Sequence, residues 1–99
     1  MARFDVFRAR NSALLLLDLQ SDLLDLLPTR IIAPLLPVSE MSWHIGRLNP
    51  RFEIDGKIYV LAVQRLAAVQ SNELGSRVTN LSDHSDEITA ATDFLFQGF

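Results

Sequence analysis

The sequence of 99 residues contains no cysteine, and it has only four glycines, one tryptophan and two histidines. Without cysteine the chain has no disulfide bond, no thiolate nucleophile and no cysteine-based metal site. The glycines are scattered, so there is no glycine-rich loop of the kind that binds phosphate. Basic residues are not in excess, and the net charge of −3 argues against a protein that holds nucleic acid by positive charge alone.

Long hydrophobic runs are also missing. The longest leucine run, residues 14–17, ends at Asp18 and is too short to span a bilayer. Residues 1–6 carry no long apolar region, so no signal peptide is expected. We therefore expect a cytoplasmic protein with no membrane partner. The length and the hydrophobic content of 48% predict one folded domain over residues 1–99.

The first half of the chain contains three apolar segments. Residues 4–8 are rich in strand formers and predict a strand. Residues 13–27 have helical periodicity, but a buried strand through Leu19 fits the continuous leucines equally well. Residues 30–38 begin with β-branched side chains, and Pro34 and Pro37 predict an edge strand or an irregular one.

The second half contains the clearest local signal. Asp55-Gly56 lies between two short apolar segments and predicts a hairpin with a type I′ turn, whose second strand continues through Gln64. Gly75 is expected to break the chain before the next strand. Ser82 is a candidate N-cap for a helix that ends at Gly98. Its apolar stripe would consist of Ile88, Ala91, Thr92 and Leu95.

Charge is distributed unevenly along the chain. Residues 1–77 hold all nine basic groups and eight acids, whereas residues 78–99 hold four acids and no base. One interpretation is a surface helix with acids near its positive N-terminal end. The other is an element that docks on the basic surface of a partner.

Groups that could carry catalysis are sparse. Asp18, Asp22 and Asp25 would share one face of a helix and could hold a hard cation, but no glycine-bearing calcium loop accompanies them. A structural or solvated role is favoured for these three. No spacing selects a nucleophile–base pair, and neither histidine belongs to a metal-binding motif. The sequence therefore predicts no metal site and no cofactor.

Three stretches together resemble the CcdB family of plasmid-addiction toxins. They are residues 17–25 with 30–35, residues 49–56, and residues 78–82 with 86–88 and 95–99. The resemblance implies a mainly β fold, an SH3-like antiparallel β-barrel with a C-terminal α-helix, assembled as a homodimer. It also implies that residues 14–19 form a central strand with both faces buried rather than a helix.

The resemblance further implies a protein that acts by binding and is not an enzyme. CcdB-like toxins bind the A subunit of DNA gyrase and trap the enzyme on cleaved DNA. A CcdA-like antitoxin neutralises them, and DNA is reached only through the antitoxin or gyrase. The gyrase contact of the family, Trp-Gly-Ile, matches Gln97, Gly98 and Phe99. The antitoxin-facing positions match Leu23, Leu24, Asp93 and Phe96.

Gln97 departs from the family pattern, because it replaces an aromatic ring that stacks on arginine. Losing that ring removes about 1–3 kcal/mol of binding energy, the scale of one interface hot spot. A second hypothesis is therefore an antitoxin-binding protein of this fold with weakened gyrase poisoning. For Phe96, packing in the core is as plausible as exposure, and Leu23 and Leu24 could equally be core leucines.

A third hypothesis is a MazF-type endoribonuclease, since those toxins share the barrel architecture. Such an enzyme needs a base, an acid and cations for the phosphate. The available residues are Arg30, Arg47, Arg51, His44 and His84. The negative net charge disfavours this hypothesis.

Overall fold

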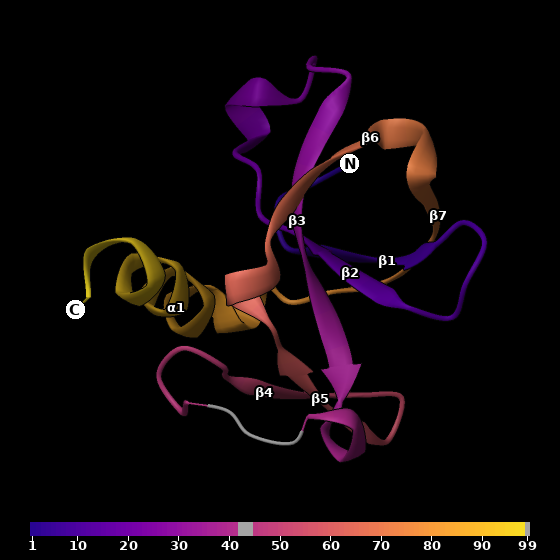
Figure 1. Ribbon diagram of the computed structural model, residues 1–99. Helices are drawn as coiled ribbons and strands as arrows, with labels where there is room; N and C mark the ends of the chain where they lie inside the picture. The colour runs from indigo at the N-terminus through magenta and orange to yellow at the C-terminus, as the bar shows by residue number, and fades with distance from the viewer. Residues whose placement is uncertain (42–44, 99) are drawn as a thin grey trace.

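The computed structural model describes residues 1–41 and 45–98, and these form a mostly antiparallel β half-barrel with one helix at its side (Figure 1). The strands are β1 (Asp5–Ala9), β2 (Leu15–Asp18), β3 (Thr29–Pro37), β4 (Arg51–Ile54), β5 (Lys57–Leu61), β6 (Ala67–Gln70) and β7 (Leu74–Asn80), and the helix is α1 (Ser85–Gln97). The main strand order is β4-β5-β3-β2-β1-β7, with β6 also paired to β3. The predicted fold class is confirmed.

Strand β3 joins the two parts of the sheet. On one edge it pairs with β2, and on the other its first half pairs with β6 and its second half with β5. The prediction of an edge or irregular strand was therefore wrong. The carbonyl of Pro34 accepts the N–H of Ala62 at 2.9 Å, and a strand residue directs N–H and C=O to the same side. The N–H that proline lacks would thus point, at Pro34, to the place where the partner of β3 changes from β6 to β5. Pro37 is the last residue of the strand.

Strand β2 is buried on both faces, as the family resemblance implies and as the local helical periodicity does not. Leu15 and Leu17 belong to the main core, which α1 covers, and Leu16 belongs to a smaller cluster on the opposite face. Leucine favours a helix only weakly, and burial on both faces of a central strand outweighs that preference. The helical interpretation of residues 13–27 was wrong, since the strand ends at Asp18 and a 3₁₀ turn, Asp22–Leu24, follows.

The hairpin between β4 and β5 has the predicted turn. Asp55 and Gly56 have φ angles of 52° and 79°, which is the pair of positive values that a type I′ turn requires. The second strand does not continue to Gln64, however. It ends at Leu61, and a 3₁₀ turn, Val63–Arg65, buries Val63 in the main core beneath the helix.

Helix α1 begins two residues later than predicted, with His84 at its N-cap position. Ser82 is not its N-cap, because Ser82–His84 form a 3₁₀ turn and the N–H of Ser82 donates to the side chain of Asn80 at 2.8 Å. The predicted end is confirmed, since Gly98 has a φ of 81° and its N–H bonds to the carbonyl of Phe94. Ile88 and Ala91 are fully buried and attach the helix to the core.

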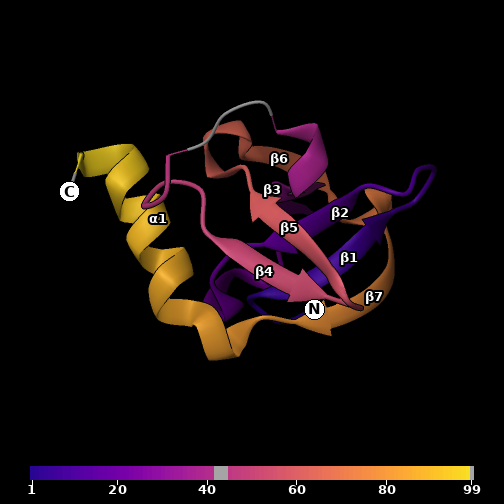
Figure 2. The ribbon, with the colours of Figure 1, turned by 90° about the horizontal axis from the view of Figure 1, so that it is seen from below.

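Strand β7 closes the sheet against β1. Gly75 does not break the chain as predicted, because it lies inside β7. An added Cβ there would come within 2.7 Å of the carbonyl oxygen of Arg8, so glycine permits the close approach of the two strands. Asp5 pairs with Asn80 at the other end of the contact. Figure 2 shows α1 along one side of the strands, with the β4–β5 hairpin beside it. Within the described ranges no helix is both long and apolar enough to cross a membrane.

Candidate functional site: a leucine-rich loop beside the helix end

Residues 21–28, which make up most of the connection between β2 and β3, form a loop with an unusual surface, called here the leucine loop. Leu23 is 94% exposed and Leu26 is 99% exposed, while Leu24 and Leu27 are each about half exposed. A single exposed leucine is ordinary, but four within five residues make a contiguous apolar patch. Exposed apolar patches are typical of surfaces that bind another molecule, which makes the loop a candidate binding surface.

A buried ion pair holds the leucine loop to the sheet. Arg30, at the start of β3, is 1% exposed, and Asp18, at the end of β2, is 0% exposed. The Nε and Nη2 atoms of Arg30 both donate to Oδ2 of Asp18, at 3.0 and 2.5 Å. Its Nη1 atom donates to Oδ1 of Asp25 at 2.9 Å. One guanidinium therefore ties the middle of the exposed loop to the most deeply buried carboxylate of the barrel.

Further hydrogen bonds fix the ends of the loop. The side chain of Gln20 accepts the N–H of Ile31 at 3.1 Å and donates to the carbonyl of Leu24 at 2.9 Å. Oδ1 of Asp22 accepts the N–H of Arg3 at 2.7 Å. Together with the contacts of Arg30, these bonds attach the loop to the sheet and to the N-terminal segment at several points.

These contacts support one of the two interpretations of the three aspartates. Asp18, Asp22 and Asp25 each accept a hydrogen bond from a protein donor, which supports the structural role. Burial raises the pKa of Asp18 above its ordinary value, and the N–H of Gln20 and the guanidinium of Arg30 offset that effect in part. Among the described residues no group of acidic and histidine side chains is arranged to hold a metal ion.

A pocket of about 470 Å³, called here the loop–helix pocket, lies between the leucine loop and α1. Its apolar walls come from four segments of the chain and consist chiefly of Leu24, Leu27, Ile31, Leu66 and Phe96, together with Thr92. Phe96 is 71% exposed and projects from the last turn of the helix. The fold therefore brings an element near residue 25 and another near residue 95 to one concave surface.

The structure brings together some of the predicted partner-binding residues. Leu24 and Phe96 line the same pocket, and Asp93 is exposed on α1 one residue from the pocket wall. Leu23 is exposed outside the pocket. Packing of Leu23, Leu24 and Phe96 in the core, the alternative that the sequence left open, was wrong. Their roles in binding stay predictions.

Sequence reasoning missed the other half of the apolar surface. Leu26 and Leu27 extend the exposed patch, and Leu66 forms part of the pocket, yet none of them was a candidate. The signal was the doubled pattern Leu23-Leu24-Asp25-Leu26-Leu27, since neither face of a short element can bury all four leucines.

The predicted gyrase-contacting tip continues from the end of α1. Gln97 and Gly98 are exposed, and Phe99 lies outside the described residues. The helix carries acids and no base, with Asp86 and Glu87 in its first turn. This agrees with a surface helix whose acids face its positive end.

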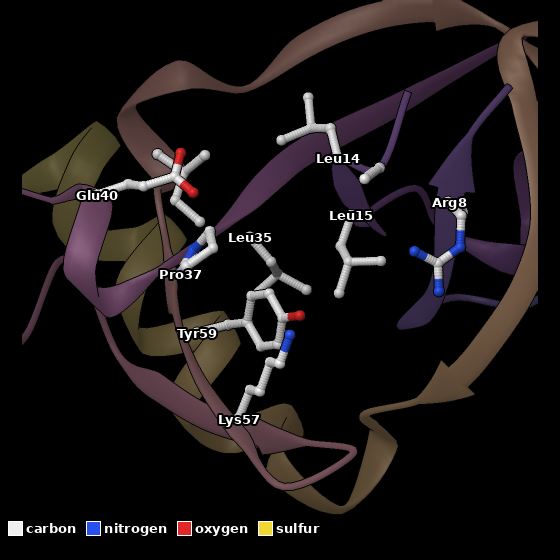
Figure 3. Close-up of a pocket in the computed structure, with 10 residues that line it drawn as sticks. Arg8, Leu14, Leu15, Leu35, Pro37, Glu40, Lys57 and Tyr59 are labelled. Carbon is white, nitrogen blue, oxygen red and sulfur yellow. The ribbon is translucent and has the colours of Figure 1, made fainter. Parts of the chain in front are cut away.

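A second cavity, of about 390 Å³, opens between β1, β2, β3 and the β4–β5 hairpin (Figure 3). In Figure 3 Arg8 lies at one side of it and Lys57 and Tyr59 lie at another, around a floor that includes Leu15 and Leu35. Glu40 is the acidic residue in the lining of the cavity. The cavity thus combines two cations and one acid on an apolar floor.

The residues named for the ribonuclease hypothesis do not meet at this cavity. Arg30 is buried in ion pairs, and Arg47 stacks on the ring of Phe94 at 4.8 Å. His84 contacts Glu87 at 3.3 Å, and His44 lies outside the described residues. Of the four that the structure describes, none lines the cavity.

Comparison with solved structures defines the class of fold. An endoribonuclease in complex with its cognate antitoxin, from a mycobacterial species, matches with a TM-score of 0.78 at 11% identity, over 100% of this chain and 98% of that chain. The half-barrel with its C-terminal helix is thus a fold found in toxin–antitoxin proteins. At this identity the likeness concerns the fold alone.

The family is more specific. Residues 3–98 match the family described as CcdB protein, and the chain belongs to the CcdB family. The resemblance noted from the sequence is confirmed, and membership places the chain among the toxins of toxin–antitoxin systems. A comparison with curated proteins gives no significant match.

Proposed function

We propose that this protein is a toxin that binds the A subunit of DNA gyrase and traps gyrase on cleaved DNA, in the cytoplasm. The observation that carries the proposal is membership of the CcdB family over residues 3–98. The free end of α1 supports it, because Phe96, Gln97 and Gly98 are all exposed and continue into the terminal Phe99. Action by binding fits the sparse catalytic residues, and it requires no cofactor.

The antitoxin is proposed to cover the adjoining surface, with Leu23, Leu24, Asp93 and Phe96 among its contacts. Leu24 and Phe96 line one pocket, and that pocket lies beside the helix end that we assign to gyrase. An antitoxin bound there would exclude gyrase by occupying neighbouring surface. We also propose a homodimer, as the family implies, which contacts DNA only through gyrase or the antitoxin.

Gln97 favours a second candidate function, an antitoxin-binding protein with weak gyrase poisoning. Gln97 has no aromatic face to stack on a guanidinium, and the energy at stake is about 1–3 kcal/mol. That corresponds to a loss of roughly tenfold to a hundredfold in affinity. Both candidates keep the antitoxin as partner and differ only in gyrase inhibition.

Gyrase supercoiling and DNA-cleavage assays with the purified protein test the proposal. Gln97→Trp is expected to strengthen inhibition by roughly fivefold to thirtyfold, because it restores an aromatic face worth about 1–2 kcal/mol. Ala90→Trp is the matched control, since Ala90 is exposed on the same helix and lies outside the loop–helix pocket.

Removing residues 97–99 is expected to abolish inhibition while leaving the barrel folded, because Gln97 and Gly98 are exposed and the core clusters consist of other residues. Circular dichroism verifies the fold of the truncated protein. Inhibition that survives the truncation would refute the assignment of the tip. Cleavage of single-stranded RNA by the purified protein would favour the ribonuclease hypothesis instead.

A further inference from the structure

We infer that the second cavity, between β1, β2, β3 and the β4–β5 hairpin, is a binding site for a small phosphate monoester with a flat apolar body. Among the described residues, this cavity shares no lining residue with the loop–helix pocket, and α1 contributes none of its walls. The inference therefore concerns a different surface from the proposed gyrase and antitoxin contacts, and it does not depend on them.

A row of side chains across three strands forms the floor and one wall of the cavity. Leu15 of β2 pairs with Arg8 of β1 and with Leu35 of β3. Residues that lie opposite each other in paired strands point to the same face of a sheet. Leu15 and Leu35 are buried in the main core. The side chain of Arg8, which is exposed, therefore stands at the edge of an apolar floor.

A β-bulge in β7 lies opposite Arg8. The register between β1 and β7 shifts between Phe7 and Ala9, so that two residues of β7, Gly75 and Ser76, oppose the single residue Arg8. Bulges are common beside binding sites, where they redirect a side chain. Arg8 forms no ion pair with a described residue of β7 or of any other element. Its guanidinium is therefore available to a ligand.

The β4–β5 hairpin supplies the opposite wall. Tyr59 pairs with Pro37 of β3, and its half-buried ring packs against the main core. Lys57 lies two residues earlier and on the same face, because side chains alternate along a strand. In Figure 3 the amine of Lys57 and the hydroxyl of Tyr59 point toward the side of the cavity where Arg8 lies. Two cations and one hydroxyl thus face the same space.

The two cations favour an anion with more than one charge. Lys57, like Arg8, forms no ion pair with a described acid, although Glu40 lines the same cavity. A phosphate monoester carries a charge of about −1.5 to −2 at neutral pH and three strong acceptor oxygens. Arginine binds phosphate through two parallel N–H donors, and lysine binds it as a point charge. The pair therefore matches a phosphate better than a singly charged carboxylate.

The apolar floor determines the rest of the ligand. The cavity volume of about 390 Å³ is near the lower end of the range for small-molecule sites, so one ring system with its phosphate fits. The ring of Tyr59 offers a flat surface on which a planar group can stack. In Figure 3 Glu40 lies on the side away from Arg8, and its charge disfavours a second anionic group at that end.

Titration of the ¹⁵N-labelled protein with phenyl phosphate, followed by NMR, tests the inference. We expect saturable shifts at the amides of the strands that line the cavity, with a Kd in the millimolar range or tighter. Inorganic phosphate is expected to bind about tenfold more weakly, because it leaves the apolar floor in contact with water. Phenylacetate, with a single charge, is also expected to bind more weakly than phenyl phosphate. Adenosine monophosphate, as a further probe, distinguishes a nucleotide from a simple aryl phosphate as the source of the monoester.

Charge-neutralising variants locate the phosphate. Arg8→Gln and Lys57→Gln are each expected to weaken binding of phenyl phosphate by about threefold to tenfold, and both side chains are exposed, so the fold is retained. Arg10→Gln is the matched control, since Arg10 is exposed on the same β1–β2 hairpin and lies outside the cavity lining. It is expected to bind normally. Glu40→Gln is expected to bind at least as tightly as the unmodified protein.

Four results would overturn the inference. The first is the absence of saturable shifts at the cavity with phenyl phosphate up to about 10 mM. The second is equal weakening by Arg10→Gln, which would indicate attraction by overall charge. The third is inorganic phosphate binding as tightly as phenyl phosphate, which would leave only an ion on surface cations. The fourth is tighter binding of phenylacetate. None of these results bears on gyrase inhibition, so the proposed function is tested separately.

Discussion

Replacing Arg30 by methionine tests how far the barrel and its leucine loop depend on one buried guanidinium. Methionine keeps much of the apolar volume and removes the charge. Asp18, which is 0% exposed, would then lose both hydrogen bonds from Arg30, and Asp25 would lose its tie to the sheet.

The expected loss of stability is large because the change leaves the buried carboxylate of Asp18 without a positive partner. Removing one partner of a buried ion pair destabilises a protein by about 3–5 kcal/mol, since the other charge stays desolvated without compensation. Small domains have a total stability of about 5–15 kcal/mol. Arg30→Met therefore removes from about a fifth of the free energy of unfolding to all of it, and at the low end of stability it unfolds the protein.

Urea denaturation at neutral pH, followed by circular dichroism, measures the change. Arg65→Met is the control, because Arg65 is exposed on a surface turn, and it is expected to change stability by less than about 0.5 kcal/mol. In Arg30→Met the pKa of Asp18 rises further above its unfolded value. The penalty applies in full above that folded pKa and is relieved as the pH falls through it, so the deficit shrinks in acid.

The double variant Asp18→Asn with Arg30→Met separates charge from packing. It is expected to be more stable than Arg30→Met alone, because it no longer buries an unpaired carboxylate. A loss below about 1 kcal/mol for Arg30→Met, or a double variant less stable than the single one, would refute this account of the network.

Two further predictions concern the closure of β1 on β7. Burial opposes ionisation of Asp5, but hydrogen bonds, with Asn80 foremost, lower its pKa overall. Asp5→Asn should therefore reduce the free energy of unfolding by about 1.5–3 kcal/mol at neutral pH. The difference in stability between the two proteins should narrow progressively below pH 3.8, where the unfolded state takes up the proton first. If the difference between the urea midpoints of the two proteins stayed constant from neutral to acid pH, the reasoning would be wrong. Gly75→Ala should cost about 1–3 kcal/mol, because its Cβ would meet the carbonyl of Arg8. Gly46→Ala, with open space around it, should leave the thermal midpoint nearly unchanged, and equal shifts would contradict the steric argument.

Two features of the fold that depend only on residues close together in the sequence were predicted correctly. The turn at Asp55-Gly56 and the helix end at Gly98 follow from the φ angles that these residues adopt, and both are confirmed. The start of the helix was less determined. No side chain caps α1, because a 3₁₀ turn, Ser82–His84, precedes it and His84 stands at the N-cap position.

Other features depend on contacts far apart in the sequence. The central position of β3, despite Pro34, depends on a gap between β5 and β6 that no window of sequence contains. The strand at β2 needed the family resemblance, because a continuous run of leucines fits a helix as well as a buried strand.

The candidate site was likewise predicted in part, and the remainder depends on contacts between distant parts of the sequence. Leu23, Leu24, Asp93 and Phe96 were named from the family pattern, whereas the pocket required Leu66 and Ile31 to meet the helix in space. The role of Arg30 in supporting the loop was not foreseen, because only the fold places it between Asp18 and Asp25.

The pairing of β1 with β7 sets a condition on biosynthesis. The ribosome makes the N-terminal strand first, but its partner begins only at Leu74, and the helix that covers the core comes later still. During most of translation Val6 and Leu17 therefore have no complete core to enter, and a long-range sheet of this kind forms slowly. A nascent chain thus acquires its barrel and its proposed gyrase-binding tip at almost the same moment, and a chain terminated before β7 is complete has neither.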